Sequence, residues 1–123
     1  MYDISYHLLN MGGRFIQYFK PEHVPDEQFI KRWLAYYYEE ANRLNNVQLS
    51  DKEFKDLIDR ELMKVLVNML MIRLILISRA LYFELGQYEE ENSEPAKNYI
   101  MAIWYDFLRY KDEHLALLDK LKN

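Results

Sequence analysis

Hydrophobic and polar residues recur along this chain with the spacing of α-helices, so the pattern predicts helices over most of its length. Near the N-terminus, apolar residues at helical spacing begin after Tyr2 and are interrupted at Gly12-Gly13. An aromatic stretch then continues to Pro21. Because glycine weakens a helix and proline cannot continue one, we predict an N-terminal helix that is bent or broken at the two glycines.

A second helix is predicted from Pro25 to about Leu44. Pro25 fits the first helical position, where its missing N–H costs nothing, and the acidic residues Asp26 and Glu27 suit the first turn of the helix dipole. Asn45-Asn46 ends the pattern. The apolar positions of this helix form one coherent stripe: Phe29, Trp33, Tyr36, Tyr37, Ala41 and Leu44.

The longest predicted helix covers about residues 51–85. Ser50 and Glu53 have the S-x-x-E spacing of a capping box, in which the two residues satisfy each other's free backbone N–H groups. Nothing breaks the pattern before Gly86, a residue suited to the position after a helix end. At about 1.5 Å per residue, this helix would be roughly 50 Å long.

A polar, acidic loop separates this helix from the last one, which is predicted from Pro95 to about Leu121 with Ser93 as its N-cap. The chain has 123 residues, of which only 3 are glycine and 3 are proline, so it fits one domain and not a turn-rich β architecture. The predicted fold class is all-α: a single-domain bundle of four to five helices over residues 1–123, with the long helix at its centre.

The most apolar segment of the chain is "VLVNMLMIRLILIS", residues 65–78. It is shorter than the roughly 20 residues of a membrane span and is flanked by charges, so we do not expect it to cross a bilayer. Arg60, Lys64, Asn68 and Arg79 define a polar stripe on this helix, but Met71 and Ile75 lie inside it. The middle of the helix is therefore apolar nearly all round. Either its own bundle covers it or another chain does, and we favour a partner because four helices rarely enclose one completely.

Arg73 lies in the middle of the most apolar face of this helix, among Leu62, Leu66, Met69 and Leu76. An unpaired charge in such a place would cost several kcal/mol. Two interpretations stay open: a structural pair with a carboxylate or carbonyl of a neighbouring helix, or an arginine at an interface.

Charge and chemistry limit the possible functions. The 20 acidic and 16 basic residues give a formal charge of −4, so strong direct nucleic-acid binding is not expected. The chain has no cysteine, and its start does not resemble a signal peptide, which suits the cytoplasm or a nucleoid reached through partners. None of His7, His23 and His114 belongs to a metal-binding pattern, so we expect surface or capping histidines, no cofactor and no enzyme.

Aromatic residues are abundant, with 11 Tyr, 6 Phe and 2 Trp. Most are expected to be core or bundle-edge residues. Tyr36, Tyr37 and Tyr38 point about 100° apart on a helix, so one core face cannot accept all three. At least one of them is expected to be exposed or to meet a partner, as tyrosines often do at interfaces.

Three segments carry a resemblance to a known family: "VPDEQFIKRWLAYYYEEANRL", "DRELMKVLVNMLMIRLILISRALYFELG" and "AKNYIMAIWYDFLRYKDEHL". They resemble the helical A-domain of GINS replication-complex subunits, of the kind in which this domain comes first. The family's long helix with an L-x-x-R-[LA] core is similar to this chain at Glu61, Leu70, Arg73, Leu74 and Gly86. The chain departs from the family in having no β-rich B-domain after Lys122, and in having Met71 and Ile75 where further basic residues are usual.

The resemblance implies a non-enzymatic subunit of a tetramer that links the replicative helicase to other factors and packs sideways against sister subunits. The predicted function is accordingly that of a protein-interaction scaffold in a homo- or hetero-oligomer. The alternatives are a small phage or virus protein that inhibits a host machine, or a homodimeric structural protein. The candidate interface residues are Arg73, Asn68, Met71, Ile75, Trp33, Tyr36, Tyr37, Tyr82 and Trp104.

Overall fold

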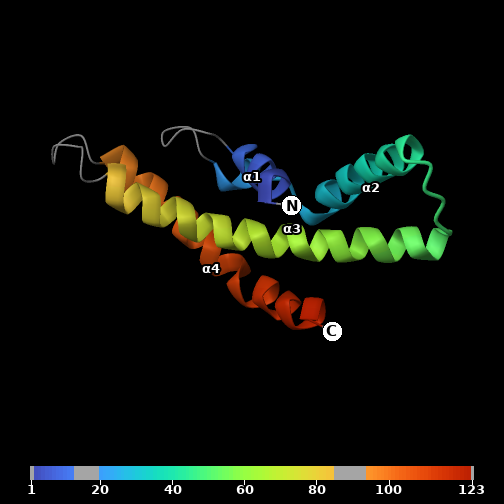
Figure 1. Ribbon diagram of the computed structural model, residues 1–123. Helices are drawn as coiled ribbons and strands as arrows, with labels where there is room; N and C mark the ends of the chain where they lie inside the picture. Colours follow the sequence, from blue (N-terminus) through green and yellow to red (C-terminus); the bar gives the residue numbers. More distant parts are fainter. Residues whose placement is uncertain (1, 13–19, 85–93, 123) are drawn as a thin grey trace.

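The computed structural model describes residues 2–12, 20–84 and 94–122, and every regular element in these ranges is helical (Figure 1). The elements in chain order are α1 (Tyr2–Asn10), the short 3₁₀ helix η2 (Pro21–His23), α2 (Glu27–Leu44), α3 (Asp51–Arg79), the π-helical η3 (Ala80–Glu84) and α4 (Glu94–Lys122). The predicted all-α fold with one long helix is confirmed. The aromatic stretch before Pro21, Gly86 and the acidic loop with Ser93 lie outside the described residues.

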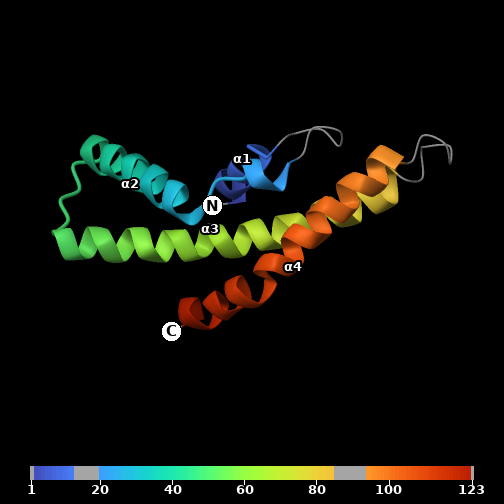
Figure 2. The ribbon, with the colours of Figure 1, turned by 180° about the vertical axis from the view of Figure 1, so that it is seen from behind.

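The long helix α3 is the common packing partner of the other three helices. α1, α2 and α4 each pack against α3 more extensively than against one another. α1 and α2 lie along one side of α3, whereas the C-terminal half of α4 diverges on the other side, as both views show (Figures 1 and 2). The arrangement is therefore open, and part of the surface of α3 is not covered by another described helix.

The two ends of the α2–α3 connection follow from local side-chain chemistry. Ser50 and Glu53 form the predicted capping box: the Ser50 N–H donates to Glu53 Oε2 at 2.8 Å, and the Glu53 N–H donates to Ser50 Oγ at 3.3 Å. The predicted stop at Asn45-Asn46 is also confirmed, because Asn45 is the C-cap of α2 and Asn46 has a φ of 55°. Asparagine adopts this left-handed conformation more readily than most residues.

The start of α2 differs from the prediction by two positions. Asp26 is the N-cap and accepts a hydrogen bond from the Phe29 N–H at 2.8 Å. Pro25 therefore precedes the cap and does not occupy the first helical position. The physical reason is that an aspartate carboxylate can satisfy a free N–H of the first turn, which proline cannot do.

The buried face of α2 also differs from the predicted stripe. The buried residues of α2 are Ile30 and Leu34, whereas Tyr36 is 78% exposed and Leu44 is 66% exposed. Trp33 packs partly against the core. The core thus takes the aliphatic residues, and most of the predicted aromatic stripe lies toward its edge or in solvent.

Two groups of buried side chains run along α3. The first joins α1, α2 and the N-terminal two thirds of α3, and includes Leu8, Leu34, Leu62 and Val65. The second joins the C-terminal third of α3 to α4, and includes Leu70, Ile77, Ile103 and Phe107. Leu76 packs against both groups, so the two cores are continuous at that point.

Candidate functional site

An apolar surface feature lies on the C-terminal half of α3 and continues into η3. Met71 is 46% exposed, Ile75 is 48% exposed and Tyr82 is 79% exposed. They follow one another at steps of four and seven residues, so they lie on one side of the helix. An open depression of about 610 Å³ lies there. Its lining consists of Met71, Leu74, Ile75, Ser78 and Arg79 of α3 together with Tyr82 of η3, and we call this set the outer face of α3.

The outer face brings together several of the residues predicted for an interface. Met71, Ile75 and Tyr82 belong to it, and half-buried Asn68 precedes Met71 by one helical turn. The sequence left open whether this chain's own helices cover the middle of α3. The described helices do not cover α3 completely, because the outer face stays exposed. Large side chains that are half-exposed in a row are a costly arrangement in water and are typical of association surfaces.

Arg73 lies on the opposite, buried side of α3. It is 2% exposed, and its Nε donates to Asp106 Oδ2 on α4 at 2.5 Å. Its guanidinium carbon also lies 5.2 Å from the centre of the Tyr110 ring. Of the two interpretations of Arg73, the structural ion pair is therefore the one observed. Arg73 is not a surface residue of this chain, and its place among the interface candidates is corrected.

A cavity of about 60 Å³ adjoins this ion pair. Residues from α2, α3, α4 and the segment between η2 and α2 surround it, among them Glu27, Arg73, Tyr110, Glu113 and His114. The Tyr110 and His114 rings stack with centres 5.0 Å apart. Within the described residues, Arg73 Nη1 and His114 Nδ1 are buried atoms without a hydrogen-bond partner.

His114 is a buried residue and not the surface or capping histidine that was expected. It is 5% exposed. Burial lowers the pKa of His114 below 6.5, and the nearby Arg73 charge lowers it further, whereas Glu113, Asp106 and the backbone of Leu66 act in the opposite direction. The imidazole is therefore mainly neutral at neutral pH.

A second buried carboxylate links α2 to α3. Glu61 is mostly buried and accepts a hydrogen bond from the Tyr38 hydroxyl at 3.1 Å and from Lys64 Nζ at 2.6 Å. Burial raises the pKa of Tyr38 to about 12, and the charge of Glu61 and its hydrogen bond raise it as well. Tyr38 therefore remains a neutral donor and holds α2 against α3.

The aromatic interface candidates on α2 and α4 lie apart from the outer face. The Trp33 and Tyr37 rings are stacked with centres 5.6 Å apart, and Tyr36 is exposed. The prediction that one of the three adjacent tyrosines is exposed is thus confirmed. On α4, Trp104 is 39% exposed and stacks on Phe107 at 5.4 Å. None of these residues lines the depression on the outer face.

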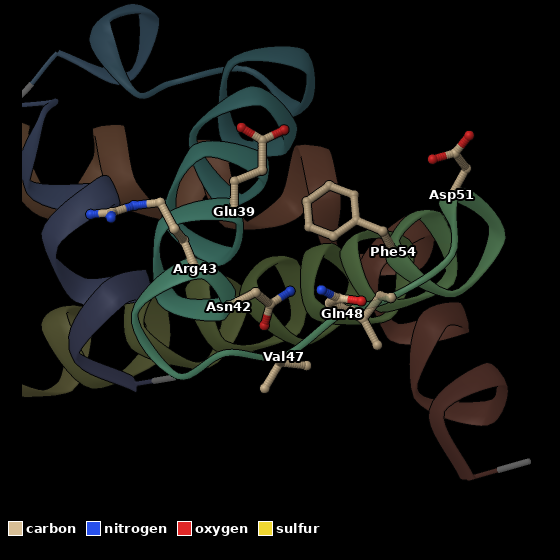
Figure 3. Close-up of a pocket in the computed structure, with 8 residues that line it drawn as sticks. Glu39, Asn42, Arg43, Val47, Gln48, Asp51 and Phe54 are labelled. Carbon is tan, nitrogen blue, oxygen red and sulfur yellow. The ribbon is translucent and has the colours of Figure 1, made fainter.

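Another open depression, of about 540 Å³, lies between α2, α3 and the connection that joins them (Figure 3). It is surrounded by Glu39 and Asn42 from α2, Gln48 from the connection and Phe54 from α3 (Figure 3). Its acidic and basic side chains lie around the rim without a shared buried partner. We therefore regard it as the space beneath a tight connection and not as a binding site.

Sequence reasoning missed two residues of the buried site, Asp106 and His114, of which Asp106 could not be found from local patterns. Asp106 is 33 positions away from Arg73 in sequence. His114, however, follows Phe107 by seven residues and Tyr110 by four, which places all three on one face of α4. That spacing was a usable signal that His114 is directed inward.

Comparisons with protein-family models, with curated proteins and with solved structures give no match for this chain. Among the described residues, no group of three or more His, Asp or Glu side chains could hold a metal ion. The helical segment Asp51–Tyr82 is long and apolar enough, by length and composition, to cross a membrane. The sequence analysis called residues 65–78 too short for a membrane span because it counted only the residues between the flanking charges. By the length and composition of the whole helix, that statement is wrong. Half of that apolar window is buried within the protein, and core helices pass the same test.

Proposed function

We propose that this chain is a non-enzymatic scaffold subunit that associates with a helix of another protein through the outer face of α3. The observation that carries the proposal is the exposed row of Met71, Ile75 and Tyr82 beside a 610 Å³ depression on the open side of the fold. A partner helix lying in this depression would bury all three side chains, and burial of apolar surface is the main favourable term in association.

The resemblance to GINS A-domains gives the proposal a specific form. In this form the partners are sister helical subunits, and the assembly connects the replicative helicase to other replication factors in the cytoplasm or at the nucleoid. The exposed helix face supports sideways packing of subunits. The replication role rests on the resemblance of the three quoted segments.

The test is to isolate the tagged full-length chain from its native cells and to measure the mass of the complex by light scattering. Ile75→Glu places a charge in the middle of the outer face, and the matched control Leu44→Glu changes an exposed aliphatic residue at the end of α2. We expect Ile75→Glu to weaken recovery of the partner at least about tenfold, as for a central interface residue, and Leu44→Glu to leave it unchanged.

The identity of the bound chain then separates the possibilities. Helical sister subunits with helicase factors support the GINS form, and a nuclease or polymerase target supports a phage or virus inhibitor. A complex of two copies supports a homodimeric structural protein. A strictly monomeric chain, or partner binding that Ile75→Glu does not weaken, contradicts the proposed interface.

A further inference from the structure

The outward side of α4 has a row of large apolar side chains that is separate from the outer face of α3. We call this row the α4 stripe, and its members are Met101, Trp104, Tyr105 and Leu108. Their exposed fractions are 45%, 39%, 63% and 42% in the same order. The buried residues Ile103 and Asp106 lie on the opposite side of the helix. A helix that packs on one side against a core normally presents polar residues on the other side, so an apolar outward side is typical of an association surface.

The order of residues along the α4 stripe is symmetrical about its central pair, Trp104 and Tyr105. Met101 lies three residues before this pair, and Leu108 lies three residues after it. At about 3.6 residues per turn, the four side chains lie within an arc of roughly 100° on one side of the helix. If a second copy of α4 runs antiparallel to the first, Trp104 of each copy faces Tyr105 of the other, and Met101 faces Leu108. Both copies then make the same contacts, as a two-fold symmetric interface requires.

Oppositely charged residues lie at the two ends of the stripe and on the same side of the helix. Lys97 lies seven residues before the central pair, and Asp112 lies seven residues after it. Both are exposed, and the Asp112 side chain, at 93% exposure, is only 3.8 Å from Lys111 Nζ as its nearest cation. Antiparallel copies place Lys97 of each beside Asp112 of the other, whereas parallel copies would bring like charges together. The charges therefore favour the antiparallel orientation.

A membrane surface is a poorer match for this side of α4. Asp112 and Asp119 lie on the same side of the helix as the stripe. Helices that lie in a membrane surface gain from attraction between basic residues and anionic lipids. Two carboxylates beside the apolar residues would instead be repelled by acidic headgroups.

We propose that two copies of this chain associate through antiparallel contact of their α4 stripes. Eight large apolar side chains, four from each copy, would be covered, and burial of apolar surface is the main favourable term in association. One helix from each copy makes a small interface, and small interfaces are typical of transient complexes. We therefore expect a dissociation constant of roughly 10–100 µM. This contact uses a different helix face from the one under the proposed function and leaves the outer face of α3 open to another protein.

The experiment measures the average mass of the full-length chain, purified alone, by sedimentation equilibrium across concentrations that bracket the expected dissociation constant. We expect the mass to rise from 15.1 kDa toward twice that value. Tyr105→Glu places a charge at the centre of the contact and should raise the dissociation constant at least about tenfold. Tyr36→Glu, the same substitution at an exposed tyrosine of α2, is the matched control and should associate as wild type does. Ile75→Glu should also leave this association unchanged.

Charge-reversal variants test the antiparallel orientation. Lys97→Glu and Asp112→Lys each convert both opposite-charge pairs into like-charge pairs, and each should weaken association about tenfold at low ionic strength. The double variant restores two opposite-charge pairs and should return the dissociation constant to within about threefold of the wild-type value. Circular dichroism establishes that each variant is folded.

The inference is overturned if the chain stays monomeric at every concentration, whether or not it then binds anionic lipid vesicles. It is also overturned if Ile75→Glu abolishes association and Tyr105→Glu does not, because the outer face of α3 would then be the contact. A mass that grows beyond two copies would indicate head-to-tail contact instead. Failure of the double variant to recover would exclude the antiparallel pairing. None of these results decides whether Ile75→Glu weakens recovery of a partner from native cells, which tests the proposed function separately.

Discussion

Replacing Asp106 with leucine removes one half of the buried ion pair that joins α3 to α4. The Asp106 side chain is 4% exposed and that of Arg73 is 2% exposed, so loss of the carboxylate leaves the guanidinium with almost no contact with bulk water. Breaking a buried pair in this way costs about 3–5 kcal/mol because one charge remains buried and unpaired. A chain of this length has a total stability of roughly 6–18 kcal/mol, so the variant would lose a large fraction of it.

The assay is urea unfolding followed by circular dichroism at 222 nm. The matched control is Asp112→Leu on the same helix, where the carboxylate is 93% exposed and pairs only loosely with Lys111 at 3.8 Å. This control should change the free energy of unfolding by no more than about 0.5 kcal/mol. The double variant Arg73→Met with Asp106→Leu should recover most of the loss, because an apolar pair of similar volume often replaces a buried ion pair without cost.

The reasoning is refuted if Asp106→Leu unfolds within about 1 kcal/mol of wild type, since the pair would then contribute little in its buried setting. It is also refuted if the double variant is as unstable as Asp106→Leu alone. In that case the shape of the side chains, and not the unpaired charge of Arg73, would account for the loss.

Two further predictions concern pH and the start of α3. The pKa of His114 lies below 6.5 in the folded protein, so the unfolded chain takes up its proton first as the pH falls. The free energy of unfolding should therefore decrease from about pH 7 to pH 5, by at most about 1.4 kcal/mol per pH unit. Urea unfolding of His114→Gln should lack this decrease. An equal pH dependence in the variant would show that His114 does not cause it. Ser50→Ala removes the capping hydroxyl and should cost about 1 kcal/mol in the same assay, whereas Ser78→Ala, at an exposed position in the last turn of α3, should cost less. Equal losses would show that the cap is unimportant.

The helix ends were largely predictable because they depend on neighbours in sequence. The Ser50 and Glu53 side chains need only their own backbone groups, and Asn46 needs only its own left-handed conformation. The start of α2 was misplaced because Pro25 and Asp26 both suit the start of a helix, and spacing alone does not tell which residue supplies the cap. Local rules thus defined the elements to within a few residues.

The faces and the buried site depended on contacts between helices, which the sequence pattern does not contain. Periodicity identified α2 as a helix but did not show that aliphatic Ile30 and Leu34 would be buried in preference to the more amphipathic tyrosines. It showed that Arg73 must have a partner but not that Asp106 would provide it, because the two residues meet only when α4 packs against α3. The exposure of Met71 and Ile75 was the part of the site that the pattern placed correctly.

The continuity of the two cores at Leu76 has a consequence for local opening of the molecule. α1, α2 and Leu117 of α4 pack on one stretch of α3, and the first half of α4 packs on another. Such an arrangement can open in separate cooperative units, with amide protons at either end exchanging with solvent before the middle of α3 does. The middle of α3 would then be the last part to lose protection, and it would remain a template on which the detached helices fold again.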